Sequence, residues 1–396
     1  MSPLEERRAL IILLAVIFLM IAGFGLVIPL LPFFAKAYGA PAWQVTLLFS
    51  AFSFGQFLSE PFWGRLSDRI GRRPVLIITI AMVGLSYAAL AFAPNILAAF
   101  MIRFLTGIFA GNISTLQGAL ADITPPERRA GRMGVLGAAF SAGFTTGPAI
   151  GGLLAQPSRG ALGFQLPLLV AAGFALASAL AVVLFVRESR PPNAQPMKQV
   201  HAAGLREGFG HPIISRVVII SFIVVVGFAG IEATYGLWTE KRFGWGPRQI
   251  GLAFMVIGLL GAVCQGWLCG RLARQYGEAR TLAYGLGFMG LGLCTQGLSP
   301  NWPVAMLGFA LVCIGQSICF PNVSALISRA APPDRQGEML GLNMSGMALA
   351  RIGGPVLAGQ LFSLVAAGAP FAFSALMILP ALWFAGQVVG RMPRLA

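Results

Sequence analysis

Residues 64–73 read Gly64-Arg65-Leu66-Ser67-Asp68-Arg69-Ile70-Gly71-Arg72-Arg73. They gather four arginines and one aspartate in a chain of 396 residues of which only 10% are charged. Long stretches without charge flank this segment on both sides. A degraded copy of the same frame, GRLARQYGE, returns at 270–278. We interpret the segment as a charged loop between two membrane spans, and its echo indicates two duplicated halves.

Hydrophobic residues make up 57% of the chain, which is more than a soluble domain of this length can bury. A bilayer core about 30 Å thick is crossed by about 20 helical residues. Three long apolar runs break at 94–95, 299–301 and 368–370 and so cross twice, and shorter runs cross once, at 9–35, 37–59, 133–158, 160–186 and 249–270. Span seven, which contains Glu232, is the twelfth. The sequence therefore predicts an all-α integral membrane protein. It has twelve transmembrane helices in two six-helix bundles, 1–186 and 213–396, joined by a cytoplasmic central linker at 187–212.

The formal net charge of +15 invites a nucleic-acid interpretation, but the placement of the basic residues argues against it. If the spans alternate in direction, most of the 28 lysines and arginines lie on the side that holds both termini. Cytoplasmic segments of membrane proteins carry this excess. The first apolar run is also too long for a cleavable signal peptide. We expect an inner-membrane protein in contact with lipid, with both termini in the cytoplasm and no nucleic-acid partner.

Further landmarks repeat at nearly the same spacing as the charged segment. Pro125-Pro126-Glu127-Arg128 corresponds to Pro332-Pro333-Asp334-Arg335, and Gly147-Pro148 corresponds to Gly354-Pro355. Parallel repeats of this kind place two bundles side by side, with a binding site near the membrane midplane. The duplication therefore suits alternating access, in which two bundles rock about a central site.

Catalytic and metal-binding patterns are missing from the sequence. The two histidines, His201 and His211, fall in the central linker, and no metalloprotease, nucleophile-elbow or phosphate-loop motif occurs. The five cysteines lie in apolar spans, where we interpret them as small core residues. We expect a transporter with no metal and no organic cofactor, and not an enzyme. A membrane scaffold or sensor is the alternative.

Several motifs resemble those of the major facilitator superfamily, and within it the twelve-span drug/proton antiporters, especially the tetracycline-efflux branch. Residues 64–73 are similar to the superfamily signature between spans two and three. Span one resembles the drug-exporter pattern through Gly23-Phe24-Gly25, whereas its residues 18–22 read FLMIA where the tetracycline branch often carries an acid. The signatures of spans four and five are represented by Arg103, Gly107 and Gly111, and by Gly143, Gly147, Pro148, Gly151 and Gly152.

The resemblance implies roles for two of these motifs. A conformational latch would consist of Gly64, Asp68, Arg69, Gly71, Arg72 and Arg73, with Asp68 capping span eleven near 337–340 when the cytoplasmic side is closed. An anion stabilises a helix N-terminus in this way, or it neutralises adjacent guanidinium groups. A simple topology signal is the alternative. In span five, glycines and Pro148 predict a bent interfacial helix, with an inert packing kink as the alternative.

Charged side chains inside spans call for a role, because each costs about 2.5–3.5 kcal/mol at the bilayer centre on insertion scales. Glu232 in span seven is the deepest acid. A dry environment favours the protonated carboxyl group, which suits a proton carrier. Arg351 in span eleven is its candidate counter-ion, and a static pair between the two is the alternative. For Arg103, the resemblance implies a bond to the backbone of span one or to a nearby carboxyl group.

By analogy with the family, spans one, four, seven and ten line the substrate cavity. An apolar pocket with a few convergent polar groups suits amphipathic molecules. Interhelical hydrogen bonding or anchoring at the lipid is the alternative for each polar or aromatic candidate. The candidates are Gln56, Asn112, Gln117, Tyr235, Trp238, Gln316, Phe320 and Asn322.

Taken together, the motifs predict proton-coupled efflux of amphipathic, tetracycline-like drugs by a monomeric transporter that works by alternating access. The proton is the coupling ion. A proton-coupled transporter of a small metabolite, such as a sugar or an amino acid, is the alternative.

Overall fold

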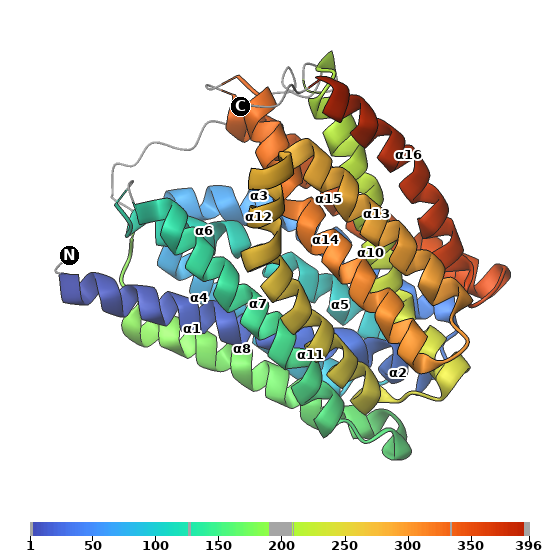
Figure 1. Cartoon of the computed structure of the whole chain (residues 1–396). Helices are drawn as coiled ribbons and strands as arrows, with labels where there is room; N and C mark the ends of the chain where they lie inside the picture. Colours follow the sequence, from blue (N-terminus) through green and yellow to red (C-terminus); the bar gives the residue numbers. More distant parts are fainter. Residues whose placement is uncertain (1–2, 126–127, 190–207, 209, 333–334, 392–396) are drawn as a thin grey trace. The chain divides into compact units, whose positions relative to one another are not determined.

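The structure is a computed structural model, and it describes residues 3–125, 128–189, 208, 210–332 and 335–391. Within these residues the chain forms twelve long helical segments, as the sequence predicted (Figure 1). Each consists of a single helix, or of helices that continue one another across a short distortion.

The first half supplies six of these segments. Span one begins as α1 (Pro3–Val27) and continues through the 3₁₀ turn η1 (Ile28–Leu30) into α2 (Leu31–Lys36), and span four is divided into α5 (Ile96–Ala110) and α6 (Ile113–Asp122). The remaining segments are α3 (Ala42–Ile70), α4 (Arg72–Ala91), α7 (Arg129–Leu154) and η3 (Pro157–Phe164) leading into α8 (Gln165–Phe185).

The second half repeats this order. Span eight is interrupted by one π-helical turn, so that α11 (Pro247–Val263) runs through η4 (Cys264–Leu268) into α12 (Cys269–Tyr276). The remaining segments are α10 (Ile214–Phe243), α13 (Glu278–Leu298), α14 (Trp302–Ala330), α15 (Gln336–Leu364) and α16 (Ala369–Arg391).

Two asparagines mark equivalent helix starts in the two halves, at breaks that the sequence predicted. The Asn95 side chain accepts a hydrogen bond of 2.8 Å from the Ala98 backbone N–H at the start of α5. The Asn301 side chain accepts one of 3.2 Å from the Val304 backbone N–H at the start of α14. Each side chain satisfies one of the free N–H groups of a first helical turn.

Ten of the described helical segments are long and apolar enough to cross a membrane by length and composition alone. The other two are α3 and α13. Polar side chains such as Gln56 and Glu60 lower the hydropathy of α3, and glycines together with Gln296 lower that of α13. Glycine-rich helices are common in membrane bundles, where small residues let neighbouring backbones approach closely.

Contacts divide the chain into two compact units. The first comprises Met1–Lys198 and Trp245–Met255, and the second comprises Gln199–Gly244 and Val256–Ala396. Within the first unit, α1 packs against α7 and α8, α3 against α5, and α4 against α8. Within the second, α10 packs against α15 and α16, and α13 against α14 and α16. The bundle limits read from the sequence, 1–186 and 213–396, stay a prediction.

The expectation of a loop at 64–73 was wrong. Residues 64–70 are the last turns of α3, Arg72 already belongs to α4, and only Gly71 separates the two helices. Gly71 has φ of +102°, which favours glycine over any L-residue, so the sharp reversal is placed on this one position. Gly64 lies inside α3 and makes no turn.

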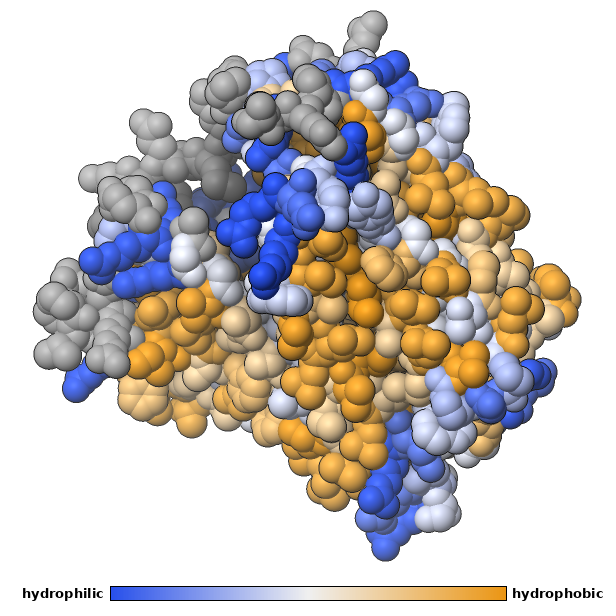
Figure 2. Space-filling model, viewed as in Figure 1, coloured by the Kyte–Doolittle hydropathy of each residue, from blue (hydrophilic) through white to orange (hydrophobic). Residues whose placement is uncertain are grey.

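Exposed apolar side chains cover the helices. Figure 2 shows hydrophobic side chains over most of the visible surface and hydrophilic ones gathered near helix ends. Leu298, Leu364 and Trp383 are each more than 60% exposed. Apolar exposure on this scale is foreign to a soluble monomer and suits contact with lipid.

Candidate functional site

The charged cluster at the α3–α4 junction is held together within the first unit. Arg72 forms ion pairs with Asp68 at 2.9 Å and with Asp122 at 3.3 Å, and its guanidinium donates a 2.6 Å hydrogen bond to the Ser67 hydroxyl. Asp68 thus lies beside a neighbouring guanidinium group, and its role stays a prediction. Its contact with 337–340 stays a prediction, and the Arg69 side chain is exposed.

Glu188 caps α4 from the end of span six. Its carboxylate accepts backbone hydrogen bonds from Arg72 at 2.8 Å and Arg73 at 3.1 Å, while the Arg73 guanidinium donates to the Val183 carbonyl at 2.7 Å. An anion here opposes the positive end of the helix dipole and the two arginines of the first turn. In the second half, α13 carries its own acid in the equivalent place, Glu278.

Glu188→Ala is expected to lower the free energy of unfolding by about 1–2 kcal/mol, because α4 loses its N-terminal acceptor. Glu188→Gln should lose less, since the amide oxygen can still accept one of the two hydrogen bonds. Thermal unfolding of the purified variants tests this order. An alanine variant as stable as the parent protein would contradict the capping role.

The span-five glycines form a stripe along α7 that lies directly on α1. A Cβ added at Gly143, Gly147 or Gly151 would lie within 2.3–2.6 Å of a carbonyl oxygen of α1. In the second half, a Cβ at Gly354 of α15 would lie 2.6 Å from the Val226 carbonyl oxygen of α10. The repeated motif thus seals equivalent helix pairs. The α7 helix continues through Pro148 and keeps its contact with α1. The bend expected at this proline stays a prediction.

Gly152, the last glycine of the motif, packs against the first turns of α11, which group with the first unit. A Cβ at Gly152 would lie 2.5 Å from the Pro247 carbonyl oxygen, and one at Gly251 would lie 2.3 Å from the Pro148 carbonyl oxygen. Sequence reasoning missed Gly251. The sequence did contain a signal for this contact, because Gly251 is a small residue one helical turn after Pro247.

Arg103 of α5 is 1% exposed and has different partners from those that the resemblance implied. Its guanidinium lies 4.5 Å from the ring centroid of Phe52 in α3 and interacts electrostatically with the phenol of Tyr87 in α4. Within the described residues it bonds neither the span-one backbone nor a carboxyl group. The guanidinium is therefore held by an aromatic face and a phenol in place of an acid.

Glu232 lies where α10, α14 and α15 meet in the second unit. Its side chain is half-buried and interacts electrostatically with Arg351 of α15 and with the Cys313 thiol of α14. Within the described residues, Glu232 and Arg351 form no direct ion pair, and the Arg351 side chain is exposed. The arrangement holds one titratable acid near an exposed positive charge.

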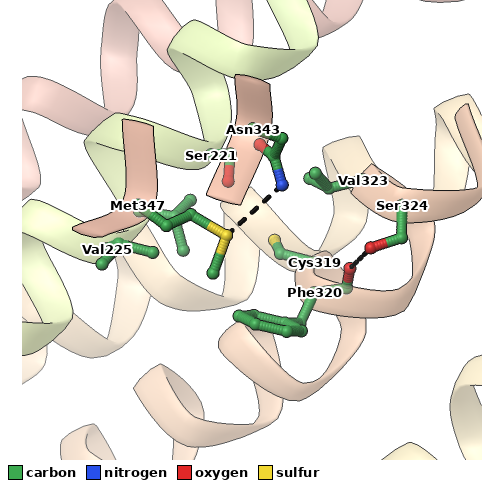
Figure 3. Close-up of a pocket in the computed structure, with 9 residues that line it drawn as sticks. Ser221, Val225, Cys319, Phe320, Val323, Ser324, Asn343 and Met347 are labelled. Atoms are coloured by element: carbon green, nitrogen blue, oxygen red, sulfur yellow. Dashed lines mark hydrogen bonds between the residues drawn. The ribbon is translucent and has the colours of Figure 1, made fainter. Parts of the chain in front are cut away.

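A small pocket, with room for about one water molecule, lies between the same three helices. Ser221 and Val225 line it from α10, Cys319 and Phe320 from α14, and Asn343 and Met347 from α15 (Figure 3). Met347 precedes Arg351 by one turn of α15, and Val225 precedes Glu232 by about two turns of α10, or about 10 Å. The pocket and the acid therefore share one face of the second unit.

The structure brings one predicted substrate residue, Phe320, to this pocket. Tyr235 stacks on Phe309 with ring centroids 4.3 Å apart, and Trp238 meets Phe371 edge to face at 4.8 Å, both in the core of the second unit. The remaining candidates are two buried asparagines and three glutamines. The Asn112 amide donates to the Thr79 hydroxyl and the Asn322 amide to the Ile318 carbonyl, whereas Gln56 and Gln316 are half-buried and Gln117 is exposed.

Known proteins share both the sequence pattern and the fold. The model of the Major Facilitator Superfamily matches residues 13–294 and 217–394. The chain belongs to this superfamily. Multidrug resistance protein 2 of Bacillus subtilis (strain 168) is 29% identical over 374 residues, covering 91% of this chain and 90% of that protein. Tetracycline resistance protein, class E, of Escherichia coli is 31% identical over 373 residues, covering 90% and 88%.

A solved structure, that of the human organic anion transporter MFSD10 (TETRAN), superposes with a TM-score of 0.72 at 26% identity, covering 97% of this chain and 100% of that one. This major facilitator protein is therefore a multi-pass membrane transporter of small molecules and not an enzyme, as the sequence predicted. The described residues contain no group of three or more His, Cys, Asp or Glu side chains that could hold a metal ion.

Proposed function

We propose that this transporter exports amphipathic, tetracycline-like drugs in exchange for protons. The observation that carries the proposal is the acid Glu232, placed beside the exposed Arg351 and on the same helix face as an apolar pocket. Relatives named for multidrug and tetracycline resistance support the substrate class. The side chains that line the small pocket are mostly apolar with a few polar groups, a composition that suits amphipathic molecules once the pocket widens.

In this mechanism Glu232 alternates between two states. The protonated carboxyl group is neutral and is tolerated in its half-buried position. When it loses the proton, the positive charge of Arg351 stabilises the carboxylate without locking it in a direct pair. A proton taken up from outside and released inside then alternates with a drug molecule taken up from inside.

Two features complete the proposal. Residues Gly64, Asp68, Arg69, Gly71, Arg72 and Arg73 act as the latch that controls which side is open, with Arg72 joining Asp68 to Asp122. The protein works as a monomer in the inner membrane with both termini in the cytoplasm, in line with the distribution of its basic residues.

A second candidate cargo is a small metabolite with an acidic group, such as an amino acid. The exposed guanidinium of Arg351 favours it, since arginine recognises carboxylates well. The charge of the cargo distinguishes the two candidates, because a neutral or cationic drug gains no binding energy from the Arg351 guanidinium.

Uptake into inverted membrane vesicles tests the proposed function. With an acidic vesicle interior, tetracycline is expected to accumulate and to release protons in a substrate-dependent manner, and dissipating the gradient should abolish both. A panel of amino acids and sugars serves as the comparison. Proton release with a member of this panel, and with no drug, would select the metabolite.

A further inference from the structure

The junction between α12 and α13 is the second-half counterpart of the charged cluster between α3 and α4, and its charges are balanced differently. In both halves the two helices follow one another around a single glycine with positive φ, which is Gly277 here (Figure 1). In the first half, three acids, Asp68, Asp122 and Glu188, all bind Arg72. The second junction lacks such a set of acids.

A single acid serves the second junction. Glu278 is the only acidic residue in the sequence between 241 and 333, and its carboxylate is paired with Arg329 at 2.7 Å. Within the described residues, Arg271, Arg274 and Arg280 have no acidic partner. Three positive charges therefore remain uncompensated around one tight turn, beside a membrane whose low dielectric strengthens the repulsion between them.

Exposed aromatic rings accompany these arginines. The Arg271 guanidinium lies 4.8 Å from the ring centroid of Trp267, whose side chain is 59% exposed. Tyr276 and Tyr284 meet edge to face with ring centroids 5.5 Å apart, and both side chains are exposed. Because tryptophan and tyrosine gather at the boundary between membrane and water, these rings place the arginines at the level of the lipid headgroups.

An exposed apolar face leads away from the junction along α13. This face carries one basic residue and then aromatic and apolar ones at helical spacing, Arg280, Tyr284, Phe288 and Leu291. The acyl chains of a lipid can lie along this face while its headgroup meets the arginines. A soluble anion would gain only the attraction of the charges, whereas a lipid gains both contacts.

We propose that the α12–α13 junction binds the headgroup of an anionic phospholipid, held by Arg271, Arg274 and Arg280, with the acyl chains along α13. A guanidinium group matches two phosphate oxygens at once, so arginine suits this role better than lysine. Clusters of basic residues at the ends of membrane helices typically attract anionic lipids. The site is independent of the cargo and of proton coupling.

Energy transfer to a labelled lipid tests this site. Purified full-length protein in neutral-detergent micelles is titrated with a phosphatidylglycerol that carries a dansyl group on one acyl chain, and transfer from the tryptophans reports binding. Unlabelled phosphatidylglycerol should displace the label at a concentration at least tenfold lower than phosphatidylcholine. The difference should shrink at high salt, because exposed charges are then screened. Equal displacement by the two lipids would overturn the proposal.

Glycerol 3-phosphate separates a lipid site from a phosphate site, because it has the charged group without the chains. We expect it to displace the label only weakly. Displacement as strong as that by phosphatidylglycerol would overturn the assignment to a lipid.

Replacing the three arginines with glutamine in one chain should abolish the preference for the anionic lipid. The single substitution Arg274→Gln should weaken binding of the anionic lipid about fivefold, and it keeps the test valid if the triple variant unfolds. A charge-matched control replaces three exposed basic residues elsewhere, Arg159, Lys241 and Arg248, and should keep the preference. A preference that persists without the junction arginines, or that the control loses equally, would overturn the site.

Discussion

Glu232→Gln is expected to reduce proton-driven accumulation of substrate at least tenfold, to the level of vesicles without a gradient. Glutamine has nearly the same shape and keeps polar contacts, but it cannot carry a proton. Substrate exchange at equal pH on both sides should continue, because exchange needs binding and movement but no proton transfer. The two measurements on one vesicle preparation separate coupling from folding.

A static ion pair between Glu232 and Arg351 predicts a different result. In that case Glu232→Gln harms the protein by leaving Arg351 uncompensated, and adding Arg351→Gln should restore transport. A coupling acid predicts no rescue in the double variant, since the proton carrier is still missing. The absence of a direct pair between the two side chains, within the described residues, favours this second result.

The sequence predicted the helices well where their ends are determined locally. Asn95 and Asn301 each cap the helix that follows, and continuous apolar runs of this length between such breakers form helices in lipid. Residues 64–70 were assigned wrongly for the opposite reason. Their charge suggested a loop, yet partners distant in sequence allow α3 to continue, with Arg72 held by Asp122 and α4 capped by Glu188.

The candidate site was less predictable because a sequence shows which residues a helix carries but not which neighbours they meet. Tyr235 and Trp238 looked like substrate contacts, and they pack against Phe309 and Phe371. Asn343 was not singled out, although an asparagine inside an apolar span is a signal. Its buried amide oxygen, which has no partner within the described residues, becomes evident only when α10 and α14 are placed around it.

Gly147→Val is expected to lower the melting temperature and to reduce transport at least tenfold. A Cβ at this position would lie 2.3 Å from the Ala22 carbonyl oxygen, so α7 must move away from α1. Overpacking of this kind costs about 1–3 kcal/mol, and here the obstacle is backbone, which yields less than a side chain. Unfolding in detergent and drug uptake in vesicles measure the two effects.

Gly137→Val is the matched control on the same helix, because no atom lies within 4 Å of a Cβ placed there. Both substitutions change helix propensity equally, so any difference between them reports the contact with α1.

The second half offers the same comparison with Gly354 and its neighbour Gly353, of which only Gly354 faces a backbone. If the repeated motif has the same function in both halves, Gly354→Val should impair transport and Gly353→Val should not. A harmless Gly354→Val would show that the duplicated sequence has kept its shape but lost its role.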